Sequence, residues 1–244
     1  MENIANDTAF YEYRVVINGK LQQKPVPNSN KKYDGGAHNG GTGKCYKMST
    51  ALNERNWDYV IINQGATEGH IKETYAQLPD YFNYIKSQVP NAKILFNVPW
   101  TLSELCFLRD QSAFPDILSA IQACDFSQEK QYEMIVDCAK TQVEPLDFYK
   151  IIPQVTVVAN CRTVLSDNVI IGSENEQKRY GHASEGFGRY MVGLSLVSCV
   201  TGEDISNIKY KPASVTDEQK TIAIESVLNA LAKPYEITQS QYIN

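Results

Sequence analysis

The sequence predicts an α/β fold with a mostly parallel sheet. Three short apolar runs, at 58–63, 93–98 and 148–152, are separated by segments with helical periodicity, and this alternation is typical of βαβ units with right-handed crossovers. Each run ends in polar residues or a proline, as expected for buried parallel strands whose ends meet a cleft. With 244 residues, of which 43% are hydrophobic, the chain is long enough for one complete core, so we expect a single domain over 1–244.

The N-terminal part predicts a β-hairpin followed by a polar loop. Asn18-Gly19 lies between the extended runs 13–17 and 20–22, and this dipeptide favours a tight turn because both positions accept positive φ. Residues 25–43 are rich in Asn, Gly and Lys. We therefore expect 11–43 to be a hairpin and mobile loop inserted in the domain.

The middle of the chain alternates helix and strand. We expect a helix over 44–56 before the first strand, and a second helix after it. The apolar face of this second helix consists of Ile71, Tyr75, Leu78, Phe82 and Ile85. Pro90 then turns the chain into the second strand, and Pro99-Trp100 follows that strand directly.

The C-terminal half predicts further helices at about 112–143 and from 155 to 162, then a polar loop over 167–178. Ser184 is expected to be the N-cap of the next helix, which Gly202 ends. A last amphipathic helix carries Ile222, Ile224, Val227, Leu228 and Leu231.

Composition excludes several classes of function. A net charge of -5 argues against nucleic acid as a partner, and no apolar run reaches membrane-spanning length. The six cysteines lack CxxC spacing, so we expect scattered, mostly buried thiols and no metal site. The glycine-rich stretch 34–44 is not a phosphate loop, because His38 replaces a required glycine and Cys45 a required Ser or Thr. We expect no cofactor.

Polar residues follow the predicted strands where α/β folds carry out chemistry. They are Asn63, Gln64, Gly65 and Thr67 after the first strand, Trp100 after the second, and His182 just before a helix. His182 is a candidate acid/base by virtue of its pKa, or else a loop histidine without a role. Gln64 could instead satisfy strand-end backbone groups, and Trp100 could be a core aromatic. Arg162 is a candidate cleft donor, but we favour a charge on a helix surface.

Several segments together resemble the SGNH/GDSL hydrolase superfamily, and more narrowly a branch of uncharacterised bacterial GDSL-like proteins. The similar segments include Trp57-Asp58-Tyr59-Val60-Ile61-Ile62-Asn63-Gln64, Trp100, Ile151-Ile152-Pro153 leading to Arg162, and the stretch from His182 to Tyr190. The resemblance runs from about residue 10 to 205. No segment alone identifies the superfamily, but the order and spacing of the segments together favour it.

This resemblance implies a flavodoxin-like three-layer α/β/α fold and serine esterase chemistry on a small-molecule or carbohydrate ester. A serine would attack the acyl carbonyl, His182 would accept its proton, and an aspartate three residues earlier would orient the histidine. Gly65 and a polar side chain would stabilise the oxyanion, and Gln64 is a better candidate for this side chain than Thr67. Asn63, Trp100 and Arg162 would contribute to the same oxyanion or substrate-binding region.

The sequence departs from the family pattern at three places. Arg179 occupies the aspartate position and cannot accept a hydrogen bond from imidazole. Thr67 stands where the family pattern has asparagine. The serine segment has no counterpart, because Ser29 and Ser49, the only serines before the first strand, follow no apolar strand. Either the chain is truncated, or the scaffold has lost its chemistry.

We therefore expect a hydrolase-like scaffold that is inactive as the chain stands. The alternative is a non-catalytic carbohydrate-binding or interaction module. A sheet without its first strand or strands would expose an edge, and such an edge favours self-association. No signal peptide follows Met1, although a missing upstream segment would make the protein secreted or periplasmic. A nucleotide-binding flavodoxin-like protein is disfavoured, because no glycine-rich turn follows a predicted strand.

Overall fold

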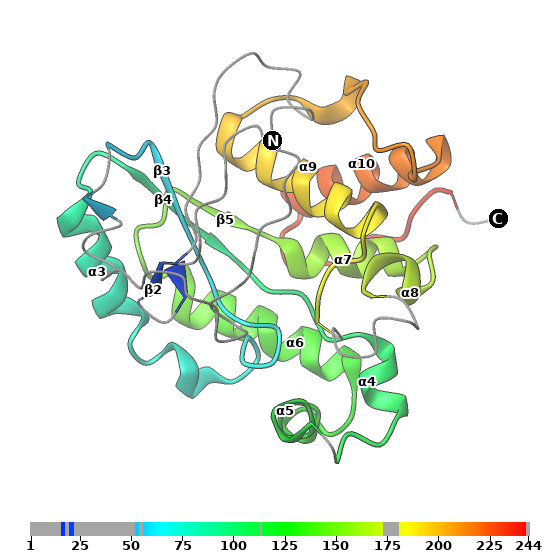
Figure 1. Ribbon diagram of the computed structural model, residues 1–244, viewed down its shortest axis with the longest axis horizontal. Coiled ribbons are helices and arrows are strands. Elements are labelled where there is room, and N and C mark those ends of the chain that lie inside the picture. Colours follow the sequence, from blue (N-terminus) through cyan, green and yellow to red (C-terminus); the bar gives the residue numbers. More distant parts are fainter. Residues whose placement is uncertain are drawn as a thin grey trace.

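The predicted parallel sheet is present in the computed structural model, which describes residues 16–17, 20–21, 52–53, 56–112, 114–172 and 181–242. Its strands are β3 (Tyr59–Asn63), β4 (Lys93–Asn97) and β5 (Lys150–Ile152), in the order β3-β4-β5. Both pairings are parallel, which confirms the fold class (Figure 1).

The register brings the carboxyl ends of the strands to one edge of the sheet. Asn63 is paired with Asn97, and Asn97 with Ile152. The segments that leave the three strands therefore start side by side. This edge is where open α/β sheets bind ligands.

Helices cover both faces of the sheet and make the three layers. They are α3 (Leu78–Gln88) and α6 (Gln128–Cys138) on one face, and α7 (Gln154–Arg162), α9 (Phe187–Thr201) and α10 (Asp217–Ala232) on the other side (Figure 1). Phe96 of β4 packs with α3 and α6, whereas its neighbour Leu95 packs with the end of α9. Alternate residues of a strand point to opposite faces, so β4 contributes to both cores.

The predicted N-terminal hairpin is also present. Strand β1 (Val16–Ile17) pairs antiparallel with β2 (Lys20–Leu21), on either side of Asn18-Gly19. The polar loop at 25–43 lies outside the described residues, as does most of the helix predicted at 44–56.

The apolar face predicted after β3 is correct, but one helix was predicted where two elements are present. The 3-10 helix η1 (Lys72–Tyr75) precedes α3, whose first turn contains Pro79. Proline fits the first turn of a helix, where its missing N–H is not needed, and so it favours a new start there. Tyr75, Phe82 and Ile85 are buried as predicted.

The helices predicted over 112–143 are α5 (Pro115–Ala123) and α6, followed by a π-helical turn, Ala139–Val143. The short helix α4 (Glu104–Leu108), capped by Ser103, was not predicted. The predicted loop after residue 167 begins instead with a short helix, α8 (Asp167–Ile170).

The start of α9 corrects the predicted cap. The N-cap is Gly186, whose φ of 89° suits glycine, and not Ser184. Ser184 nevertheless supplies the capping bond from two residues earlier, since its Oγ accepts from the Gly188 N–H at 2.9 Å and donates to the Val169 carbonyl. Gly202 ends the helix as predicted, with a φ of 75°.

The last helix, α10, starts with a capping box formed by Thr216 and Gln219. The short 3-10 helix η3 (Ile205–Asn207) precedes it. The five cysteines that the structure describes are all buried, in agreement with the prediction, and burial raises the pKa of Cys106 to about 12. Within the same residues, no helix is both long and apolar enough to cross a membrane.

Candidate functional site

Three segments meet beyond the carboxyl ends of β3 and β4: the turn after β3, the loop after β4 and the loop that carries His182. The indole Nε1 of Trp100 donates to the Gly181 carbonyl at 2.7 Å. A β-carbon added to Gly181 would lie 3.3 Å from Cβ of Ala66 and 3.5 Å from Cδ2 of Leu102. The structure thus brings together the three predicted polar clusters.

His182 is exposed and lies between two anchored positions. Gly181 before it is held by Trp100, and Ala183 after it forms an antiparallel bridge with Ile171. The N–H of Ser184 also donates to the Ile170 carbonyl at 2.9 Å. The imidazole is therefore carried by a short loop fixed at both ends, while Arg179 lies outside the described residues.

The Gln64 side chain points towards η1. Its Nε2 donates to Thr74 Oγ1 at 3.1 Å, and its Oε1 accepts from the Gly65 N–H at 3.0 Å. Both candidate oxyanion donors, the Gln64 amide and the Gly65 N–H, are thus occupied within the protein. This is the arrangement expected of an amide that satisfies strand-end backbone groups, and the oxyanion role remains a prediction.

The turn that follows Gln64 has two glycines at close contacts, Gly65 against the flexible end of the Glu68 side chain and Gly69 against the ring of Pro99. A β-carbon on Gly65 would lie 2.2 Å from the Glu68 carboxylate, and one on Gly69 would lie 2.3 Å from Pro99 Cγ. Gly69 thus allows the turn to lie against the start of the loop after β4. Asn63 is exposed at the end of β3, and Thr67 is half-buried in the turn.

Trp100 is half-buried and packs against the core formed by α7, α9 and α10. With its ring in this core and its N–H bound to Gly181, the side chain joins the loop after β4 to the His182 loop. This arrangement agrees with the core-aromatic alternative.

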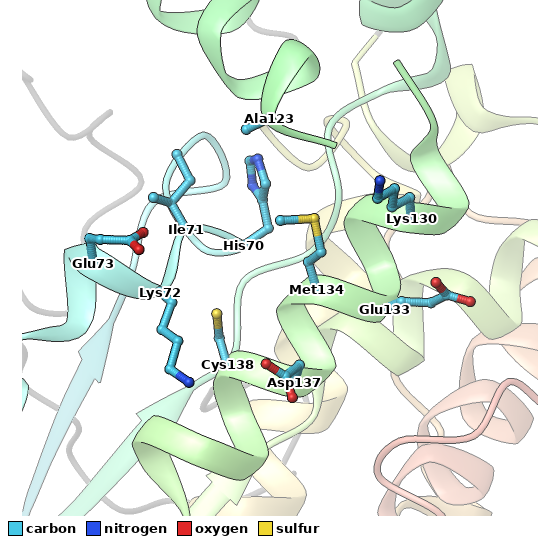
Figure 2. A pocket seen from close by; sticks show the side chains of 10 residues that line it. All are labelled: His70, Ile71, Lys72, Glu73, Ala123, Lys130, Glu133, Met134, Asp137 and Cys138. Atoms are coloured by element: carbon cyan, nitrogen blue, oxygen red, sulfur yellow. The ribbon is translucent and has the colours of Figure 1, made fainter. Parts of the chain in front are cut away.

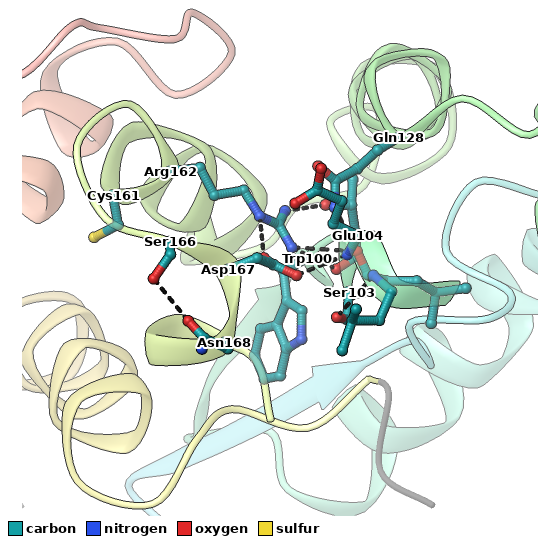
Figure 3. Close-up of polar contacts among 12 residues, drawn as sticks. Trp100, Ser103, Glu104, Gln128, Cys161, Arg162, Ser166, Asp167 and Asn168 are labelled. Carbon is teal, nitrogen blue, oxygen red and sulfur yellow. Dashed lines mark hydrogen bonds and ion pairs between the residues drawn. The ribbon is translucent and has the colours of Figure 1, made fainter. Parts of the chain in front are cut away.

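Arg162 is not the helix-surface charge that we favoured. Its side chain is 14% exposed and its Nε lies 2.6 Å from Asp167 Oδ1. The guanidinium also donates to Thr101 Oγ1 and, at 3.2 Å, to the Leu102 carbonyl (Figure 3). Asp167 in turn accepts from the Glu104 N–H at 2.7 Å. Arg162 therefore holds the loop after β4 in place, which its position near the end of a predicted helix did not indicate.

Sequence reasoning missed two buried polar residues that connect the same segments, Gln131 and His70. Gln131 on α6 accepts from the Leu102 N–H at 2.8 Å and donates at 3.3 Å to both the Ala66 carbonyl and His70 Nδ1. His70 Nε2 lies 2.8 Å from the Ala120 carbonyl. A signal for Gln131 existed, since it shares the buried face of α6 with Ile135.

A cavity of about 560 Å³ lies behind the turn, between η1 and α6 (Figure 2). His70, Met134 and Cys138 line it, together with charged residues that include Lys72 and Asp137. None of the predicted site residues lines it. Burial lowers the pKa of His70, and this effect outweighs the opposing effects of the Ala120 carbonyl and Glu68.

Comparisons with known proteins identify a family but no activity. A family model described as a domain of unknown function (DUF4886) matches residues 28–230. The crystal structure of a DUF4886 family protein from Bacteroides uniformis ATCC 8492 is 22% identical, with a TM-score of 0.68 over 84% of this chain and 75% of that chain. At this identity it is evidence for the fold alone, and no curated protein matches the chain. Because the family model covers most of its length, the chain belongs to the DUF4886 family.

Proposed function

We propose that this chain has the scaffold of an SGNH/GDSL-like acyl-ester hydrolase, with His182 in the position of the base. The observation that carries this proposal is the hydrogen bond from Trp100 to Gly181, which holds the His182 loop at the carboxyl edge of a parallel sheet. An exposed imidazole there can accept a proton from a hydroxyl group near the strand ends. The ligand class is a small-molecule or carbohydrate ester.

We further propose that the chain as it stands binds an ester without hydrolysing it. A serine needs an adjacent base to become a nucleophile. Ser184 is two residues from His182, but its Oγ accepts from the Gly188 N–H and donates to the Val169 carbonyl. Arg179, at the position of the orienting aspartate, cannot accept a bond from the imidazole.

The oxyanion donors of such a site would become available together. Gln64 Oε1 accepts from the Gly65 N–H, while Gln64 Nε2 donates to Thr74. Rotation of this one side chain away from Thr74 would free both N–H groups for a ligand oxygen. Such donors act on developing negative charge at the carbonyl oxygen.

The test combines hydrolysis and binding. Release of nitrophenol from p-nitrophenyl acetate is measured for the wild-type chain, for His182→Ala and for Ser184→Ala as a matched control. We expect the same background rate in all three. A clear rate that disappears only in His182→Ala would show that the chain does have a nucleophile, and it would overturn the non-hydrolytic part of the proposal.

Binding is measured by calorimetry with O-acetylated and unmodified xylobiose. The hydrolase scaffold predicts preference for the acetylated sugar, and this preference is expected to weaken in Gln64→Ala. Equal binding of both sugars, unaffected by Gln64→Ala and His182→Ala, would favour the alternative of a non-catalytic carbohydrate-binding module. That alternative would need a stacking surface other than Trp100, whose ring packs against the core.

A further inference from the structure

The amide of Gln131 has one orientation that its backbone partners allow. The Leu102 N–H can only donate, so the atom 2.8 Å from it must be Oε1. The Ala66 carbonyl can only accept, so the atom 3.3 Å from it must be Nε2. Two backbone groups far apart in the sequence thus fix which way the amide lies.

This orientation of the amide fixes the tautomer and the charge of His70. The second hydrogen of Gln131 Nε2 points to His70 Nδ1, 3.3 Å away, so Nδ1 must accept. Nε2 must then carry the proton, which it donates to the Ala120 carbonyl at 2.8 Å. The network is complete only with a neutral, Nε2-protonated imidazole.

We propose that His70 and Gln131 are positioning residues that hold the turn 64–70 to the loop 99–103 only while His70 is neutral, so that mild acid loosens the connection. The turn carries the proposed oxyanion donors and the loop holds the His182 loop through Trp100, and to that extent the inference depends on the proposed function. The connection itself exists in the protein without ligand.

Protonation leaves no satisfactory arrangement. The new Nδ1–H faces the NH₂ group of Gln131, donor against donor. If the amide turns round, its NH₂ faces the Leu102 N–H and its oxygen faces the Ala66 carbonyl. Either way at least one buried hydrogen bond is lost, and an unsatisfied buried group is costly. His70 is 1% exposed and Gln131 fully buried, so bulk water cannot directly replace the lost partner.

The charged groups around His70 come from four segments of the chain and include both signs. They are Glu68 in its own turn, Lys72 and Glu73 on η1, Lys130, Glu133 and Asp137 on α6, and Asp125, which pairs with Lys130. Burial is nevertheless the largest effect on the pKa of His70 and lowers it from 6.5. His70 lies in the wall of the 560 Å³ cavity, beside several of these charged groups (Figure 2).

The test is an NMR titration of the full chain without ligand, between about pH 8 and pH 5. We expect His70 to be the Nε2–H tautomer with a pKa below 6.5. The chemical shifts of the Leu102 amide and the Trp100 indole N–H are expected to change with the same pH midpoint. At pH values below this midpoint, the hydrogen-exchange protection of Leu102 is expected to fall about tenfold. His70 is identified by comparison with His182→Ala and His38→Ala.

Two variants sharpen the test. In His70→Gln, the side chain can still donate to Ala120 but does not titrate, so the Leu102 amide is expected to become insensitive to pH. In Gln131→Glu, a carboxylate can accept from both Leu102 and a protonated Nδ1, so the pKa of His70 is expected to rise above 6.5 and Leu102 to be better protected in acid. If His70 had only a structural role and its titration did not matter, Gln131→Glu would not change the response of Leu102 to acid from loss of protection to gain.

A wild-type His70 pKa at or above 6.5 would overturn the inference. So would titration of His70 with no change at Leu102 or Trp100. Both outcomes come from the wild-type chain, so they do not depend on whether the variants fold. Failure of ester binding would contradict the proposed function and leave this titration unaffected.

Discussion

Asn63 on β3 and Asn97 on β4 are register partners, so two amides lie side by side at the carboxyl edge of the sheet. Asn63 is exposed, whereas the Asn97 Oδ1 is buried and has no hydrogen-bond partner among the residues that the structure describes. An unsatisfied buried acceptor costs about 1–3 kcal/mol. The edge of the sheet therefore has a buried acceptor that the described part of the chain does not satisfy.

Asn97→Leu is expected to leave the free energy of unfolding unchanged or to raise it by about 1 kcal/mol, because it removes that acceptor and keeps the branched shape of the side chain. Urea denaturation measures the change. Asn63→Leu, at the exposed partner, is the control and is expected to have little effect. A clear loss of stability in Asn97→Leu would show that the amide oxygen has a partner in solution.

Arg162→Met is expected to lower the free energy of unfolding by about 3 kcal/mol. It leaves Asp167, whose side chain is 9% exposed, without its ion pair, and an unpaired buried charge is strongly destabilising. Lys86→Met is the matched control, since the pair of Lys86 with Asp147 is exposed and worth about 0–1 kcal/mol. Equal effects of the two substitutions in urea denaturation would refute the assignment.

Trp100→Phe keeps an aromatic ring in the core but removes the bond to the Gly181 carbonyl. We expect a loss of about 1 kcal/mol and faster hydrogen exchange at the Ser184 amide, which belongs to the same loop. Trp57→Phe, the same substitution outside this loop, is the control and is expected to leave hydrogen exchange at Ser184 unchanged. Unchanged exchange at Ser184 would mean that Trp100 does not hold the loop.

Thr74→Val removes the hydroxyl that accepts from Gln64 Nε2. If ligand binding requires Gln64 to turn away from Thr74, the affinity for O-acetylated xylobiose is expected to rise about three- to tenfold, the equivalent of one hydrogen bond. Isothermal titration calorimetry measures this affinity. Weaker binding would indicate instead that the observed orientation of Gln64 is the one that binds.

The lowered pKa of His70 predicts that stability depends on pH below 6.5. In that range the unfolded chain binds a proton that the folded chain does not, so the free energy of unfolding rises with pH. The contribution of His70 is complete above 6.5 and is lost as the pH falls towards the folded pKa, by at most about 1.4 kcal/mol per pH unit. Urea denaturation at several pH values checks this, and His70→Gln is expected to have a shallower dependence.

The strands and main helices were predictable because their signals are local. The apolar runs at β3, β4 and β5 and the periodic face of α3 need no knowledge of distant residues. The boundaries of the helices were less predictable, as the division between η1 and α3 shows.

The connections within the candidate site were not predictable, because their partners are far apart along the chain. Gln131 bonds to Leu102 and Ala66, which are 29 and 65 residues away, and Arg162 bonds to Thr101, 61 residues away. A polar residue on a helix gives no indication of which loop it will meet. His182 could be placed near the strand ends from the sequence, but the means by which its loop is held could not.

The joint between Trp100 and the His182 loop uses a main-chain carbonyl, at a residue without a side chain. The identities of the neighbouring residues hardly enter into it. A substitution at the exposed position 182 leaves this hydrogen bond in place, whereas Ser184 and Gly186 in the same loop are tied to the start of α9. The path of the loop is therefore set by the residues on either side of position 182 and not by the imidazole.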